Sequence, residues 1–60
     1  MPDELTRHLN QTVTIRTTAG AAYTGVLVEL GFWAIKLQLP TRREPVKVRR
    51  ADIAALVPVR

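Results

Sequence analysis

The chain has no cysteine and only one histidine among its 60 residues. Disulfides, thiolate zinc sites and metal sites built on paired histidines are therefore excluded, and we expect neither a metal nor a cofactor. No apolar run approaches the roughly 18 residues that cross a bilayer, and the opening MPDELTRHLN is too polar for a secretory signal. These features predict one soluble, cytoplasmic domain spanning residues 1–60, with no membrane partner.

Residues suited to catalysis are also scarce. Nothing in the sequence supplies His8 with the nucleophile and the orienting group that a general base needs. Asp3 and Glu4 are adjacent, so they point to different faces of a helix and cannot act as a paired acid and base. The three glycines are spread along the chain and form no phosphate-binding loop. We therefore expect a binding or structural protein, not an enzyme, and no small-molecule substrate.

Hydrophobic residues make up 47% of the chain, which is enough for a core. The pattern predicts a short α-helix over residues 2–9, because Pro2 suits a first turn and Leu5 and Leu9 lie four apart on one face. Asn10 can end this helix in a left-handed conformation. A helix this short is unstable alone, so we expect its leucines to dock on the rest of the domain.

From residue 12 the hydrophobic period changes to two, which is typical of half-buried strands. Val13 and Ile15 are expected to face inward in the first strand, and Gly25 lies inside the second, where a barrel corner requires a sharp bend. Closely spaced strands pair as antiparallel neighbours. The pattern therefore predicts a mostly β fold, a small, strongly bent, five-stranded antiparallel barrel of SH3-like type with a short N-terminal α-helix. The expected strands are residues 12–18, 22–30, 32–39, 46–50 and 53–59.

The last expected strand is apolar on both faces and carries no charge to protect its edge. Such an edge aggregates unless another strand covers it, and a second copy of the same chain is the simplest cover. A domain this small also gains stability from self-association. We therefore expect a homo-oligomer, with interface candidates Ile53, Ala55, Leu56 and Val57.

Positive charge is concentrated in the C-terminal third. Residues 1–39 are neutral overall, and residues 40–60 carry the whole net charge of +4. Residues 41–50, TRREPVKVRR, alone sum to +4. A clustered basic segment indicates a polyanionic partner such as a nucleic acid, while the alternative is that a small domain uses net charge for solubility.

Two segments resemble the motifs of the Sm-like superfamily, which includes Sm, Lsm and Hfq-type proteins. LNQTVTIRTTAGAAYTGVLVEL is similar to the first Sm motif, with a V-x-I strand, a turn glycine and G-x-L in a bent second strand. VKVRRADIAALVP is similar to the second, with an arginine turn and an isoleucine-led final strand. The resemblance covers residues 3–58 and is closest in pattern to small bacterial Sm-like proteins.

The resemblance implies a five-stranded barrel that the helix caps at one end. It implies a homo-hexameric or homo-heptameric ring, in which the last strand of one subunit pairs with the fourth strand of the next. That pairing adds Val46 and Val48 to the interface candidates. The resemblance also implies that single-stranded RNA binds around the pore.

The chain departs from the family pattern at several RNA-binding positions. Gly31 stands where the family carries an aspartate, Ile35 where it carries the asparagine that holds a base, and Ala51 where Hfq has a functional histidine. The residues that keep the pattern are Trp33, at the stacking aromatic, and Arg49 and Arg50, at the basic turn.

The aromatic candidates for RNA binding are Trp33 and Phe32. An exposed aromatic can stack a base of any identity. Trp33 shares the alternation face of Ile35 and Leu37, however, which predicts that it lies in the core or at a subunit interface. One of the two aromatics should then be exposed, and Tyr23 is expected to pack rather than to bind.

The arginine candidates also have structural alternatives. Arg49 and Arg50 hold phosphates or bases, or belong to a solvated turn, or pair with Glu29 or Asp52 of a neighbouring subunit. Non-specific phosphate contact is the role expected of the loop residues, and solvent exposure that of the strand lysines. The loop residues are Arg42 and Arg43, and the lysines are Lys36 and Lys47.

Three functions fit the sequence. The first is a homo-oligomeric Sm-like protein that binds single-stranded RNA through its basic turns and loops. The second, favoured by Gly31 and Ile35, is an oligomeric structural or protein-interaction module of the same fold that does not bind RNA. The third is a small barrel that binds duplex DNA non-specifically through a basic face.

Overall fold

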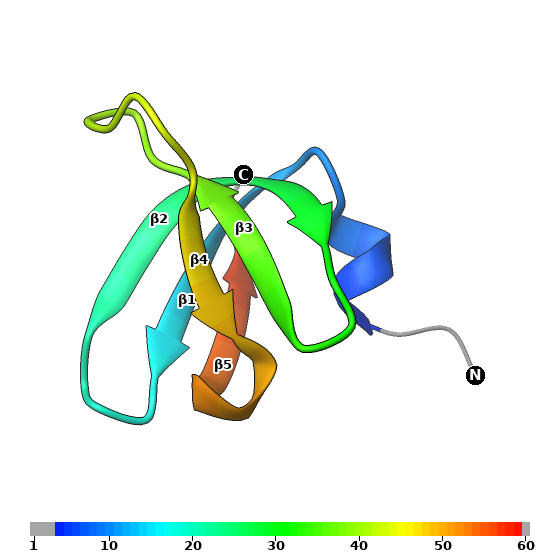
Figure 1. Cartoon of the computed structure of the whole chain (residues 1–60), viewed down its shortest axis with the longest axis vertical. Coiled ribbons are helices and arrows are strands. Elements are labelled where there is room, and N and C mark those ends of the chain that lie inside the picture. Colours follow the sequence, from blue (N-terminus) through cyan, green and yellow to red (C-terminus); the bar gives the residue numbers. More distant parts are fainter. Residues whose placement is uncertain (1–3, 60) are drawn as a thin grey trace.

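The computed structural model describes residues 4–59, which form one antiparallel sheet and two short 3₁₀ helices (Figure 1). The strand order is β4-β3-β2-β1-β5, so β4 and β5 are the two edges. The mostly β class and the five antiparallel strands are as predicted. Closure into a barrel stays a prediction, because within residues 4–59 no strand pairing joins β4 to β5. The elements are η1 (Glu4–His8), β1 (Thr12–Thr17), β2 (Ala22–Leu30), β3 (Ala34–Gln38), β4 (Val46–Arg49), η2 (Arg50–Asp52) and β5 (Ile53–Pro58).

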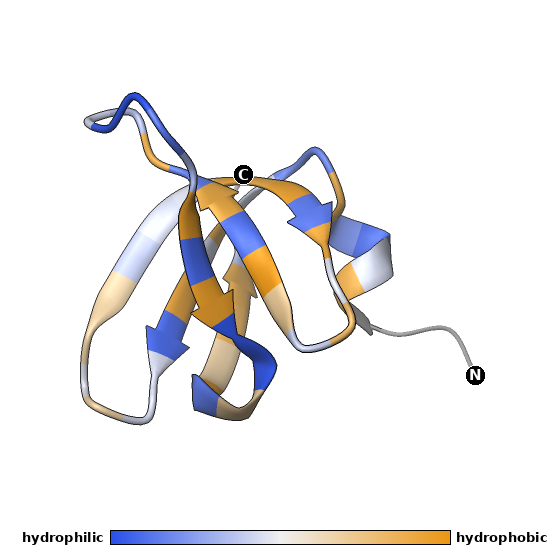
Figure 2. Cartoon of the chain, in the orientation of Figure 1, coloured by the Kyte–Doolittle hydropathy of each residue, from blue (hydrophilic) through white to orange (hydrophobic). Residues whose placement is uncertain are grey.

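The core lies on one face of the sheet. Every second residue of a strand faces this core. Val13 and Ile15 are buried there, as predicted. Figure 2 shows the same alternation of hydrophobic and hydrophilic residues along β3 and β4. Tyr23 is half-buried against this core, as expected. The buried residues are Val13, Ile15, Leu27, Ile35, Leu37, Leu39 and Val48.

A β-bulge in β2 changes which residues face inward. The register with β3 shifts between Leu27, which is opposite Leu37, and Glu29, which is opposite Lys36. Strict alternation would put Leu27 and Glu29 on the same face. The extra residue, Val28, turns Glu29 to the outer face and leaves Leu27 buried.

Gly25 lets β2 approach β3 closely. A Cβ atom at this position would collide with the backbone carbonyl oxygen of Gln38. β2 is the longest strand and curves along its whole length (Figure 1). The expected role of Gly25 in a bent strand is therefore supported by a specific backbone contact.

The expected α-helix over residues 2–9 is wrong in type: residues 4–8 form a 3₁₀ helix, and residues 2 and 3 lie outside the described residues. This helix ends at His8, before Leu9, so Leu5 and Leu9 do not share a helical face. Leu5 packs against the core and Leu9 is 39% exposed. Asn10 ends the segment at φ 67°, as predicted, and donates its backbone N–H to the Leu27 carbonyl. Within residues 4–59, no helix has both the length and the apolar composition that crossing a membrane requires.

Candidate nucleic-acid interface

Two turns that are distant in sequence meet at one end of the sheet. The first joins β2 to β3 and is closed by a hydrogen bond from the Gly31 N–H to the Ala34 carbonyl, 2.8 Å. The second is η2, between β4 and β5. Arg50 connects them, because its backbone N–H donates to the Trp33 carbonyl at 2.8 Å and its Nε donates to the Gly31 carbonyl at 2.9 Å. We call residues 31–33 together with Arg49 and Arg50 the turn site.

Both aromatic side chains of the turn site point into solvent. Phe32 is 82% exposed and Trp33 is 79% exposed. Their rings meet edge to face, with centroids 4.8 Å apart and an interplanar angle of 84°. The prediction that Trp33 lies in the core of the chain is therefore wrong. β3 begins at Ala34 rather than at residue 32, so the inward face of Ile35 does not extend back to Trp33.

Arg49 is the outermost arginine of the turn site, and it pairs within its own chain. Its Nε and a terminal nitrogen donate to the two carboxylate oxygens of Asp52, at 2.9 and 3.3 Å. This hydrogen bond, with the charge of the carboxylate, raises the pKa of Arg49. Asp52 holds the guanidinium in one orientation at the surface and compensates part of its charge.

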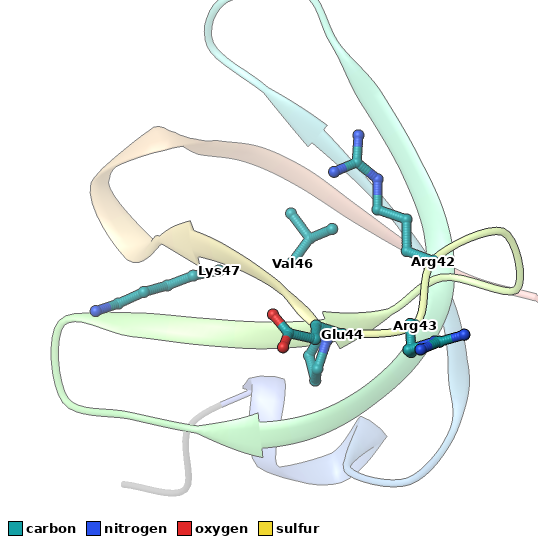
Figure 3. Close-up of a pocket in the computed structure, with 6 residues that line it drawn as sticks. Arg42, Arg43, Glu44, Val46 and Lys47 are labelled. Carbon is teal, nitrogen blue, oxygen red and sulfur yellow. The ribbon is translucent and has the colours of Figure 1, made fainter.

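Arg42 and Arg43 lie elsewhere. They belong to the loop of residues 40–45, at the opposite end of β3 from the turn site. The five residues of β3, at about 3.3 Å each, separate the loop from the turn site by roughly 16 Å. Gln38 fixes this loop by donating from Nε2 to the Leu39 carbonyl, 3.1 Å, and to the Arg42 carbonyl, 2.7 Å. Figure 3 shows the two arginines leaving the loop in different directions and Lys47 pointing away from both. The structure therefore does not gather the predicted arginines into one site.

The expected interface residues divide into two groups. Val48 is buried, and Ile53 and Leu56 pack partly against the core of their own chain, as Val46 does. Ala55 is exposed and Val57 is 51% exposed. Hydrophobic residues follow one another along β5 (Figure 2). The surface available to a second copy is therefore the outer side of β5 and the free backbone of the edge strands.

The outer face of the sheet carries charged residues that the sequence did not assign to a site. Glu29 forms an ion pair with Lys36, Oε2 to Nζ 3.4 Å, and Lys47 is directly opposite Lys36 on β4. The outward positions of the lysines follow from alternation, but the pairing with Glu29 depends on the bulge. In the described part of the chain, no three histidine, aspartate or glutamate side chains gather where they could hold a metal ion.

No protein-family model matches the chain, and neither does any curated protein or solved structure.

Proposed function

We propose that the chain forms an Sm-like homo-oligomeric ring, of six or seven subunits, that binds single-stranded RNA at the turn site. The observation that carries this proposal is the exposed pair of Phe32 and Trp33 on a turn that Arg50 holds in place. Two large aromatics in solvent are costly unless they have a partner, and unpaired bases stack on them whatever their identity.

The charge distribution supports a polyanionic ligand. Residues 40–60 carry the net charge of +4, and two arginines of this segment, Arg49 and Arg50, belong to the turn site. Arginine offers a planar fork of donors that fits phosphate. The combination of aromatic surface and fixed arginine is the one that binds single strands, since stacking needs unpaired bases.

The edges of the sheet support assembly. Within residues 4–59, β4 and β5 each pair with a strand on one side only. β5 also carries the exposed residues Ala55 and Val57. A row of unsatisfied backbone groups beside apolar side chains favours pairing with another strand. Pairing β4 of one copy with β5 of the next would cover both edges and would repeat around a closed ring.

An oligomeric interaction module without RNA binding is the second candidate. It draws support from Arg49, whose charge Asp52 compensates, and from Arg50, whose Nε is used on the Gly31 carbonyl. Ile35, at the position of the family's base-holding asparagine, is fully buried and offers no polar group to a base. On this interpretation, the exposed aromatics would contact another protein.

RNA titrations separate the two candidates. Eight-nucleotide oligo-U and oligo-A are expected to bind at about 50 mM salt, with a log–log slope near −0.7 for each phosphate contacted. Arg49→Gln removes a charge but keeps a hydrogen-bonding group for Asp52. We expect it to weaken binding about two- to fivefold and to flatten the slope by about 0.7.

The matched control is Arg43→Gln, which removes the same charge from the opposite end of β3 and should weaken binding less. If neither oligo-U nor oligo-A binds, the interaction module is favoured. Light scattering after size exclusion measures the assembly independently, and a monomer at micromolar concentration would contradict the ring.

A further inference from the structure

A second charged feature lies beside the turn site, on the outer face of the sheet. It is a hollow of about 290 Å³ with aromatic residues at one end and charged residues along its length. We call it the lysine hollow. Its lining includes Glu29, Phe32, Trp33, Lys36 and Lys47.

The strand register builds the lysine hollow. Lys36 of β3 is directly opposite Lys47 of β4, and Glu29 of β2 is opposite Lys36 from the other side. Directly opposite residues have Cβ atoms about 4.5–5.5 Å apart, so the two lysine side chains share one patch of the outer face. Phe32 and Trp33 stand where β3 begins, at the end of this row.

The charges in the lysine hollow are not balanced. Glu29 pairs with Lys36 at 3.4 Å. Among residues 4–59, the Lys47 side chain makes no hydrogen bond or ion pair. Like charges directly opposite each other destabilise a sheet, and an anion between them removes that cost. Two lysines with one carboxylate therefore leave room for one further negative charge.

We propose that the lysine hollow binds a backbone phosphate of single-stranded RNA, next to a base stacked on the aromatics of the turn site. This inference rests on the proposed function and extends it. The stacking platform requires an unpaired base, which a duplex does not offer. The hollow also lies at the lower limit of the roughly 300–1,000 Å³ typical of small-ligand pockets, which suits one segment of a continuing strand.

Glu29 gives the proposal its sharpest test, because its carboxylate would repel the phosphate and compete for Lys36. Glu29→Gln is expected to tighten the binding of eight-nucleotide oligo-U about two- to fivefold. If the Glu29–Lys36 pair were only a surface ion pair, its removal would change RNA affinity no more than the loss of one distant charge does in Arg43→Gln. The Lys36 and Glu29 side chains are 45% and 60% exposed, so we expect the variant to keep its fold, which circular dichroism checks.

Lys47→Gln is the complementary variant. We expect it to weaken binding about two- to fivefold and to make the salt slope shallower by about 0.7, the value of one lost phosphate contact. Arg43→Gln, which removes one charge from the 40–45 loop, is the control for general electrostatic attraction. An effect of Lys47→Gln that clearly exceeds that of Arg43→Gln supports a local contact.

The outcomes distinguish the two proposals. If Glu29→Gln has no effect and Lys47→Gln matches Arg43→Gln, while Arg49→Gln still weakens binding, the lysine hollow is not a phosphate site and the turn site stands. If wild-type protein does not bind oligo-U at about 50 mM salt, both proposals fail. If a duplex of equal length displaces oligo-U as well as a single strand does, the lysine hollow belongs to a duplex-binding face and the inference is overturned.

Discussion

Replacing Trp33 with alanine tests whether this exposed ring exists for binding or for stability. Trp33 is 79% exposed, so about a fifth of its surface is covered. A tryptophan buries up to roughly 250 Å² when fully enclosed, so about 50 Å² is covered here. At about 25 cal/mol per Å², the lost burial costs about 1 kcal/mol of unfolding free energy. Loss of the edge contact with Phe32 adds about 0.5–1.5 kcal/mol.

The expected cost is therefore smaller than the 3–5 kcal/mol typical of a tryptophan removed from a core. RNA affinity should fall as well, by about 1–3 kcal/mol, or roughly 5- to 150-fold, if one base stacks on the indole. Urea unfolding followed by circular dichroism measures the first quantity, and fluorescence anisotropy with labelled oligo-U measures the second. In the wild-type protein, stacking should also quench the fluorescence of Trp33, the single tryptophan of the chain.

Ile35→Ala is the matched control, because Ile35 is fully buried two residues further along the chain. It should cost about 2–5 kcal/mol of stability and leave the exposed surface unchanged. The reasoning is refuted if Trp33→Ala loses 3 kcal/mol or more of stability while RNA affinity is unchanged. If the lost stability also depends on protein concentration, the indole of Trp33 is buried between subunits.

Four further substitutions test the assembly and the fold. Val57→Asp, on the exposed side of β5, is expected to dissociate the oligomer without unfolding the subunit, because it places an unpaired charge in a strand interface; an unchanged mass by light scattering would contradict this. Leu56→Asp is a weaker test, because Leu56 also packs against the core of its own chain. Gly25→Ala should lower the unfolding free energy by about 1–3 kcal/mol, since its Cβ would collide with the Gln38 backbone. Gly20→Asn should cost less in the same urea titration, because the space around Gly20 is open and asparagine tolerates its positive φ of 88° better than most residues do.

The strands were predictable because local alternation reports burial. Val13 and Ile15 are fully buried where the period of two placed them, and β2 spans the predicted residues 22–30. The N-terminal segment was harder, because an α-helix and a 3₁₀ helix differ by a fraction of a residue per turn and two leucines do not separate them. There the packing of Leu5 against the core decides the outcome, and packing is not a local property of the sequence.

The ends of strands were harder still, and the candidate sites lie at those ends. The alternation of Ile35 extends back to Trp33 in the sequence, but the strand β3 begins only at Ala34. The turn before it is closed by the Gly31–Ala34 hydrogen bond, and Arg50 donates to the Trp33 and Gly31 carbonyls. These partners are 17 and 19 positions apart, so no local pattern encodes their contact.

The bulge at Val28 is likewise not encoded in a local pattern. Only the pairing of β2 with β3 shows that Glu29 faces outward beside Lys36. The excess of basic residues predicts a polyanionic ligand. The proposed sites depend on two irregularities, a turn and a bulge, that move aromatic and charged side chains out of the alternation and onto one surface. Deletion of Val28 tests this account, because Glu29 would then follow Leu27 directly and regular alternation would keep it on the outer face, opposite Lys36. The deletion should therefore remove the bulge and preserve the charges of the lysine hollow.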